Sequence, residues 1–240
     1  MYRALLSCGL LLGIGCVTQR MSIPVMPPLI GPPKSPVVWE EPFQQLDPQR
    51  WREVEVHGHT QYRIATLDGH PCLEARSQGH ASILLSPVRF NPRTISWLSW
   101  EWRVDQPVEG EALKTKKGSD APVRVYVYFD TQGLPWQKRS LDYVWSAFLP
   151  VGTVLESAFS AQSKILVVES GTQSLGQWRH EERNVAEDYR RAFGVNAPGA
   201  VAIGIMSDSD NTGGESLAYV RQLRVSRQSN DRAERERTQP

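Results

Sequence analysis

Residues 95–104 read ISWLSWEWRV and residues 123–130 read VRVYVYFD. In both stretches apolar side chains alternate with mostly polar ones. Successive side chains of a β-strand point to opposite faces, so this alternation predicts two long strands that each turn one face into a core. The side chains expected in the core are Leu98, Trp100, Trp102 and Val104 in the first strand, and Val123, Val125, Val127 and Phe129 in the second.

Shorter strand-like runs lie on both sides of these two stretches. Residues 62–67 and 72–77 flank the turn sequence DGHP, which is typical of a hairpin. Further runs span residues 165–169, 200–207 and 216–225. Many short strands separated by turn residues predict an all-β domain, an antiparallel and jelly-roll-like β-sandwich, over residues 39–225.

One short helix is expected near residues 185–193. Asn184 can cap its first turn, Glu187 stands three residues later as in a capping box, and Gly194 can end it. Its apolar stripe at helical spacing consists of Val185, Tyr189, Ala192 and Phe193.

The first fifteen residues have the features of a secretory signal. Arg3 precedes a short apolar run, and small residues stand before Cys16. The run is shorter than the ~20 residues that span a bilayer. Residues 1–15 are therefore expected to be a cleaved signal peptide. The sequence before Cys16 resembles a bacterial lipoprotein signal, although Gly13 stands where an aliphatic residue is preferred.

Both a lipidated Cys16 and a free mature end therefore stay open. The expected localisation is the periplasm, or the outer membrane through a lipid anchor, with no other membrane contact. Residues 16–38 contain many prolines and are expected to form an extended tether, whereas the polar residues 226–240 are expected to be a disordered tail. Cys72 has no partner in the mature chain, so no disulfide is expected.

The net charge of +1 gives no reason to expect a nucleic-acid partner. No catalytic residue is assigned either, because the glycine-rich residues 171–176 lack the spacing of a nucleophile elbow. No cofactor is assigned, with Ca²⁺ as the one open alternative.

The loop at residues 208–214 is the densest polar feature. Two carboxylates and an amide oxygen, from Asp208, Asp210 and Asn211, are a set that can bind Ca²⁺. The loop is not an EF-hand, because Tyr219 occupies the place of the closing Glu. The alternative is an ordinary connection between strands, in which these side chains bond the local backbone. We assign no metal ligands on this evidence.

Two further groups of residues are candidates for ligand binding. Arg183, Asn184 and Asp188 are explained by helix capping and local pairing, but they would form one polar pocket if they met the Asp208 loop. Tyr126 and Tyr128, with Arg124, line the face of their strand that points away from the core. Aromatic rings beside polar groups suit a sugar, unless the helix or a loop covers them.

Several phrases of the chain together resemble a bacterial family of uncharacterised exported proteins, domain of unknown function 3047. They are 100–104 (WEWRV), 124–130 (RVYVYFD), 143–145 (YVW), 183–185 (RNV), 188–189 (DY), 193–194 (FG) and 208–213 (DSDNTG). The chain departs from the family pattern at Ser119, where an Asp is usual, and at Arg221, which replaces an acidic residue. Both departures remove negative charge and weaken a metal site built on those positions.

The resemblance implies an exported single-domain protein without an established activity. The leading interpretation is a non-catalytic β-sandwich in the cell envelope that binds a glycan or cell-wall component, or that serves a structural role. The alternatives are an envelope hydrolase that uses carboxylates around Asp208 and Asp210, and a scaffold that binds another protein. The layout also resembles jelly-roll carbohydrate-binding modules, which is an analogy of fold alone.

Overall fold

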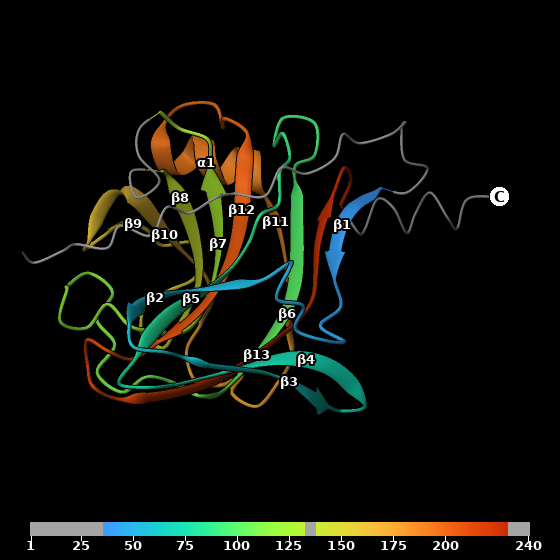
Figure 1. Ribbon diagram of the computed structural model, residues 1–240. Helices are drawn as coiled ribbons and strands as arrows, with labels where there is room; N and C mark the ends of the chain where they lie inside the picture. Colours follow the sequence, from blue (N-terminus) through green and yellow to red (C-terminus); the bar gives the residue numbers. More distant parts are fainter. Residues whose placement is uncertain (1–35, 133–137, 230–240) are drawn as a thin grey trace, which may run out of the picture.

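The computed structural model describes residues 36–132 and 138–229. Within these ranges two β-sheets pack face to face, and helix α1 (Val185–Phe193) lies at one end of the sandwich (Figure 1). The expected signal peptide, Cys16, most of the tether and residues 230–240 of the tail lie outside the described residues. No described helix is both long enough and apolar enough to cross a membrane.

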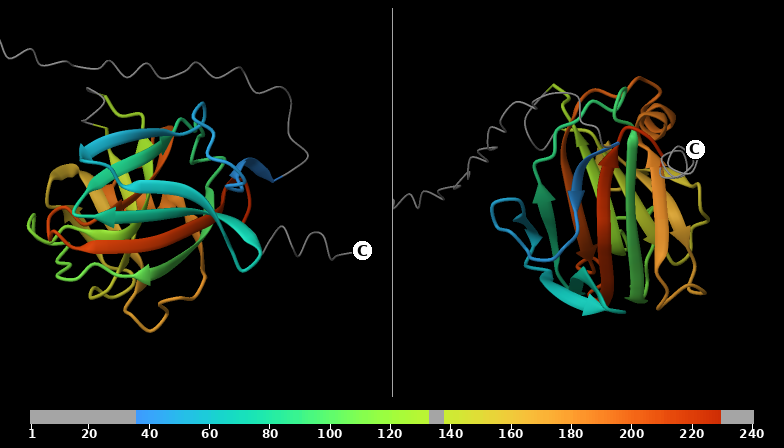
Figure 2. Two further views of the ribbon diagram at one scale, coloured as in Figure 1. Left: turned by 60° about the horizontal axis from the view of Figure 1, so that its bottom comes forward. Right: turned by 90° about the vertical axis from the view of Figure 1, so that its right-hand side faces the viewer.

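The first sheet has the strand order β11-β6-β13-β4-β3, and β1 also pairs with β13. These strands are β1 (Val37–Glu41), β3 (Gln61–Leu67), β4 (His70–Gln78), β6 (Trp97–Gln106), β11 (Arg179–Asn184) and β13 (Glu215–Ser226). Every pair is antiparallel. The right-hand view of Figure 2 shows β13 (red) between β6 (green) and β1 (blue). β1 begins two residues before the expected start of the sandwich at Trp39.

The second sheet has the order β2-β5-β12-β7-β8-β10-β9. Its strands are β2 (Arg52–His57), β5 (Ala81–Ser86), β7 (Ala121–Phe129), β8 (Ser140–Ser146), β9 (Val154–Ser157), β10 (Ser160–Ser170) and β12 (Ala200–Asp208). β8 and β10 are parallel, because the chain passes through the edge strand β9 between them; the other pairs are antiparallel.

The core lies between the two sheets and contains the side chains that the alternation assigned to it. Trp100 and Trp102 of β6 are fully buried, and their rings lie 5.4 Å from Tyr143 and 6.1 Å from Trp145 of β8. Contacts of this kind contribute ~0.5–1.5 kcal/mol each beyond the buried area and hold the sheets together. The predicted antiparallel, jelly-roll-like β-sandwich is thereby confirmed, with one parallel pair that was not expected.

Helix α1 forms where the capping pattern predicted it. The Asn184 side chain accepts a hydrogen bond from the Glu187 amide at 3.2 Å, and Gly194 ends the helix in the left-handed conformation (φ 72°). Tyr189 packs at 4.5 Å from Phe129, whose side chain belongs to the core. The helix therefore closes the end of the core and leaves the opposite face of β7 uncovered by it.

Candidate functional site

Tyr126 and Tyr128 lie on the outer face of the second sheet, opposite the inward-pointing valines of β7. Their rings are stacked, with centroids 5.6 Å apart and an interplanar angle of 13°. The cross-strand neighbour of Tyr126 on β12 is Gly204. A Cβ atom at this position would lie 3.4 Å from Tyr128 Cε2 and 3.0 Å from Ile83 Cγ2. A glycine at this position therefore leaves room for the two rings to lie across the sheet.

The stacked pair belongs to a small apolar cluster that is separate from the main core. Tyr126 is buried against Ala81 and Met206, and its hydroxyl donates to the Met206 sulfur at 3.4 Å; Tyr128 is half-buried. Burial raises the pKa of both tyrosines, so their hydroxyls stay protonated at neutral pH. Tyr126 and Tyr128 therefore lie outside the main core, in a separate cluster in which Tyr126 is buried and Tyr128 is half-buried.

Arg124, two residues before Tyr126 on the same face, forms a buried ion pair with Asp208. Its Nε and Nη2 donate to the two carboxylate oxygens at 3.0 and 3.2 Å, and Nη2 also donates to the Ser119 carbonyl at 2.8 Å. Burial opposes the charge of Arg124, but the adjacent Asp208 carboxylate raises its pKa above the ordinary value. Burial raises the pKa of Asp208 to about 6, which leaves the pair ionised at pH 7.

Asp142 of β8 lies beside the tyrosines on the same outer face. It is the cross-strand neighbour of Tyr126, and it is almost completely buried. Its carboxylate accepts hydrogen bonds from the Ser140 hydroxyl at 2.8 Å and from the Ser163 hydroxyl at 2.5 Å. Burial raises the pKa of Asp142 to about 6, which places a group that can change protonation state next to the aromatic pair.

The Asp208 loop is attached to the beginning of β7 by a third carboxylate. Asp120 accepts from the Asn211 amide at 3.1 Å, from the Thr212 amide at 2.7 Å and from the Thr212 hydroxyl at 2.8 Å. Asp120, Asp208 and Asp210 each place one oxygen within 4.8 Å of the others. The sequence presented the Tyr126 face and the Asp208 loop separately. Arg124 joins them into one polar cluster, in which Arg124, Asp120 and Asp208 are buried.

The other predicted group lies elsewhere. Arg183 and Asp188 pair with each other at 2.5 and 2.9 Å beside α1. β12 starts next to α1 and runs away from it, so that Asp208 is eight residues, or about 26 Å, along the strand from Ala200. The pocket in which Arg183 or Asp188 would meet the Asp208 loop does not form, because the two groups occupy opposite ends of β12.

Three residues of the site were not singled out as candidates from the sequence. Asp142 is a lone acid in β8, and no local pattern reveals it because its partner Ser163 lies on a different strand. Asp120 entered only through its neighbour Ser119, whose side chain is not what Arg124 contacts. Glu111 lies in the loop before β7, where it bonds the Ser146 hydroxyl and the Ala147 amide, and no local pattern indicates this contact.

The two departures from the family pattern have different consequences. Ser119 contributes its carbonyl oxygen, so the site keeps one carboxylate, Asp120, at this turn. Arg221 lies on the outer face of the first sheet, where it pairs with Glu101 at 2.5 Å and stacks 3.9 Å over Trp178. Arg221 is therefore not part of the polar cluster around Arg124 and Asp208.

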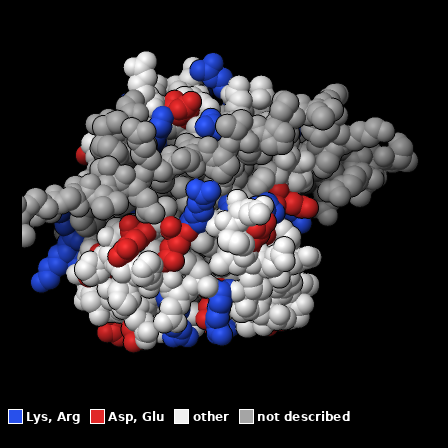
Figure 3. All heavy atoms as spheres, in the orientation of Figure 1, with Lys and Arg blue, Asp and Glu red and all other residues white. Residues whose placement is uncertain are grey.

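Charged side chains of both signs are interspersed over the part of the surface that Figure 3 draws for the described residues. In contrast, the polar cluster around Arg124 is acidic and mostly buried. The pKa values of Asp142, Asp208, Asp210 and Glu111 are all raised, in each case chiefly by burial. Raised pKa values in one place are typical of functional sites, although structural networks also produce them.

A family model described as "Protein of unknown function (DUF3047)" matches residues 49–224. The chain belongs to this family. The resemblance found in the sequence is thereby confirmed. The DUF3047 match includes every residue of the polar cluster around Arg124. No curated protein matches the chain.

Solved structures with similar folds include a carbohydrate-binding module described for specific mannan recognition. It has 11% sequence identity and a TM-score of 0.36, over 80% of this DUF3047 chain and 98% of that chain. The family 11 xylanase from Neocallimastix patriciarum has 10% identity and a TM-score of 0.35, over 78% and 98% of the two chains.

Proposed function

We propose that this chain is an exported envelope protein whose β-sandwich binds a glycan or cell-wall component on the outer face of the second sheet, without catalysing a reaction. The observation that carries the proposal is the stacked pair Tyr126 and Tyr128, on a face that α1 leaves uncovered, bordered by Asp142 and by the Arg124–Asp208 pair. Sugars bind where aromatic rings accept their C–H faces and a few placed polar groups accept or donate to their hydroxyls.

The roles of the individual groups follow from their positions. Tyr128 is half-buried and offers the accessible ring, while the buried Tyr126 supports it from the side. Ser140, the cross-strand neighbour of Tyr128, and Asp142 provide a hydroxyl and a carboxylate at the edge of the rings. The Arg124–Asp208 pair keeps the next stretch of the face rigid. This arrangement favours recognition over hydrolysis, because neighbouring side chains already donate hydrogen bonds to Asp142 and Asp208 and hold both carboxylates in place.

Replacing Tyr128 by alanine is expected to weaken glycan binding about tenfold or more, which corresponds to ~1.4 kcal/mol. The measurement is isothermal titration of the mature protein with soluble cello-, xylo-, manno- and galacto-oligosaccharides, N-acetylglucosamine oligomers and muropeptides, after a thermal-shift screen of the same panel. Tyr219→Ala is the control, since Tyr219 lies on the outer face of the first sheet beside Arg103. If no member of the panel binds, or if both variants lose binding equally, the proposed site is wrong.

The hydrolase alternative depends on Asp142 and Asp208, whose pKa values of about 6 would let one carboxyl group donate a proton near neutral pH. The same mixtures, analysed for shortened oligosaccharides, distinguish the two functions. If the unmodified protein shortens the oligosaccharides and the Asp142→Asn variant does not, the function is hydrolysis rather than binding alone. Intact oligosaccharides that still bind would support recognition without catalysis.

For export, we propose that residues 1–15 are removed and that Cys16 then carries the lipid anchor. The support is the sequence alone: an apolar run followed by Gly13, Gly15 and Cys16, and the proline-rich residues 24–36 that would hold the domain away from a membrane. Cys16→Ser is expected to move the protein from the membrane fraction to the soluble fraction of fractionated cells. Unchanged fractionation would contradict the anchor.

A further inference from the structure

Asp120, Asp208 and Asp210 bring three carboxylates together at one end of the second sheet. Asp208 ends β12, Asp210 lies in the loop that follows, and Asp120 stands immediately before β7. One oxygen of each lies within 4.8 Å of the others. Asp120 and Asp208 are buried and Asp210 is half-buried, so water screens their mutual repulsion poorly.

The positive charge that is bonded to this trio does not balance it. Among the described residues, Arg124 is the cationic side chain that forms hydrogen bonds with the trio, and it donates to Asp208 and to the Ser119 carbonyl. Asp120 and Asp210 are held by neutral donors of the loop, namely the amides and hydroxyl of Asn211 and Thr212. Buried carboxylates are normally paired or bound to a metal, because an isolated buried charge is strongly unfavourable.

A fourth oxygen at the same place has no donor. The Asn211 side-chain oxygen is inaccessible to water and has no hydrogen-bond partner. The rest of this residue is fixed: its side-chain nitrogen donates to Asp210 at 2.8 Å and its main-chain amide donates to Asp120 at 3.1 Å. The amide oxygen therefore belongs to a residue that is bonded to two of the three carboxylates, and it has no donor of its own. A cation would satisfy it, whereas another hydrogen-bond acceptor would not.

The hydrogen bonds of the trio leave coordination positions open. The Asp208 oxygen that accepts from Nη2 of Arg124 and the Asp120 oxygen that accepts from the Asn211 amide each receive one donor, so each retains a lone pair. Together with Asp210 and the Asn211 oxygen, four residues can supply ligands. Ca²⁺ takes 6–8 oxygen ligands and accepts water for the remainder.

We propose that Asp120, Asp208, Asp210 and Asn211 bind a divalent cation, and that this cation is Ca²⁺. Ca²⁺ accepts carboxylate, amide and water oxygens in a flexible geometry, whereas Mg²⁺ demands a near-ideal octahedron and gives up its water reluctantly. Three carboxylates and an amide oxygen from two separate segments of the chain therefore suit Ca²⁺ better. The bound ion fixes the 208–214 loop against the beginning of β7, directly beside Arg124. This proposal does not depend on the identity of the glycan.

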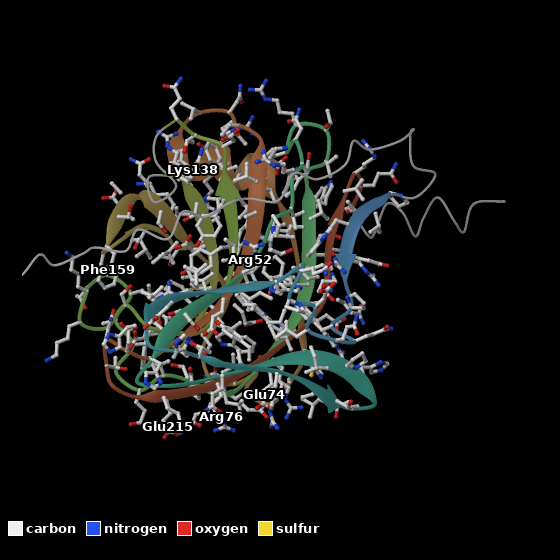
Figure 4. The ribbon with its side chains drawn as sticks, viewed as in Figure 1. Arg52, Glu74, Arg76, Lys138, Phe159 and Glu215 are labelled. Carbon is white, nitrogen blue, oxygen red and sulfur yellow. The ribbon has the colours of Figure 1, made fainter. Side chains whose placement is uncertain are left out.

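The test uses the mature chain, stripped with EDTA, exchanged into metal-free buffer and titrated calorimetrically with CaCl₂ or MgCl₂. Ca²⁺ is expected to bind with a dissociation constant of ~10⁻⁴–10⁻³ M, as in other extracellular modules, and more tightly than Mg²⁺. Asp210→Asn is expected to weaken Ca²⁺ binding at least tenfold. The control is Glu215→Gln, which removes an exposed carboxylate at the same end of the molecule (Figure 4) and should bind Ca²⁺ like the unmodified protein.

A second variant keeps the test decisive if Asp210→Asn does not fold. Asn211→Leu removes the unpartnered oxygen with little change in volume and is expected to lose most of the Ca²⁺ affinity, together with the Ca²⁺-dependent rise in melting temperature. The proposal is overturned if neither ion produces heat with the stripped protein, or if folded Asp210→Asn and Asn211→Leu both retain full affinity. Tighter binding of Mg²⁺ than of Ca²⁺ would overturn the choice of ion.

Discussion

Arg124→Met is expected to lower the free energy of unfolding by about 3–5 kcal/mol, as is typical when one partner of a buried ion pair is removed. The substitution leaves the Asp208 carboxylate buried, with the Ala121 amide as its one remaining donor among the described residues. It also removes the donor to the Ser119 carbonyl. Urea denaturation in the presence of EDTA, which keeps divalent cations out of the measurement, gives the difference.

The double variant Arg124→Met/Asp208→Leu is the matched control. A buried pair replaced by apolar groups of similar size is often close to neutral in stability, so the double variant should regain more than half of the loss. Two results would contradict the central role of this pair. One is a single-variant loss below about 1 kcal/mol, and the other is a double variant no more stable than Arg124→Met.

As the pH rises from about 4 to about 6, the titration of Asp142 is expected to lower the free energy of unfolding of the domain. Burial raises the pKa of Asp142 from 3.8 to about 6 in the folded protein, so the folded state holds this proton more tightly than the unfolded chain. The stabilisation by the protonated Asp142 is therefore complete when the pH is below the pKa of the unfolded chain. It is lost as the pH rises through the pKa of the folded protein. A shift of about two units corresponds to ~3 kcal/mol.

Asp142→Asn isolates this effect. The asparagine oxygen can still accept from one of the Ser140 and Ser163 hydroxyls and the amide nitrogen can donate to the other, but the side chain does not titrate. The difference in unfolding free energy between the unmodified protein and Asp142→Asn, measured by denaturant titration at several pH values, should change in favour of the variant as pH rises. Burial and the nearby Glu169 raise the pKa of Glu181 to about 7. The difference in unfolding free energy between the unmodified protein and Glu181→Gln should therefore also change in favour of the variant as the pH rises, up to about pH 7. A difference that does not vary with pH would contradict the role assigned to Asp142.

Much of the fold could be predicted because strands and helix caps have local signatures. Trp100 and Trp102 alternate with Ser99 and Glu101, and a period of two residues is enough to assign them to a buried face. Asn184 and Gly194 mark the ends of α1 through contacts within one turn. The parallel pairing of β8 with β10 had no such signature, because the intervening edge strand β9 is short and only partly buried.

The candidate site could be predicted only in pieces. Tyr126 and Tyr128 were recognised from alternation, and Asp208 with Asp210 from the density of polar residues in one loop. Asp142 was missed, since a lone acid in a strand acquires its meaning from Ser163 of a different strand. Arg183 and Asp188 were placed with the wrong neighbours as an alternative, because sequence proximity to a polar loop says nothing about which end of a strand that loop occupies.

By itself, the sequence determined β3, β4, β6, β7, β10, β12 and β13, the faces of β6 and β7 that enter the core, and where α1 begins and ends. It did not reveal β1, β2, β5, β8, β9 or β11. The features that it determined depend on side-chain direction along a single stretch of chain, which repeats every two residues in a strand. Only the tertiary structure decided that Arg124 meets Asp208, 84 residues later, and that Asp120 and Asn211 join them. Strand order within a sheet follows from the packing of all strands at once, and no local period encodes it.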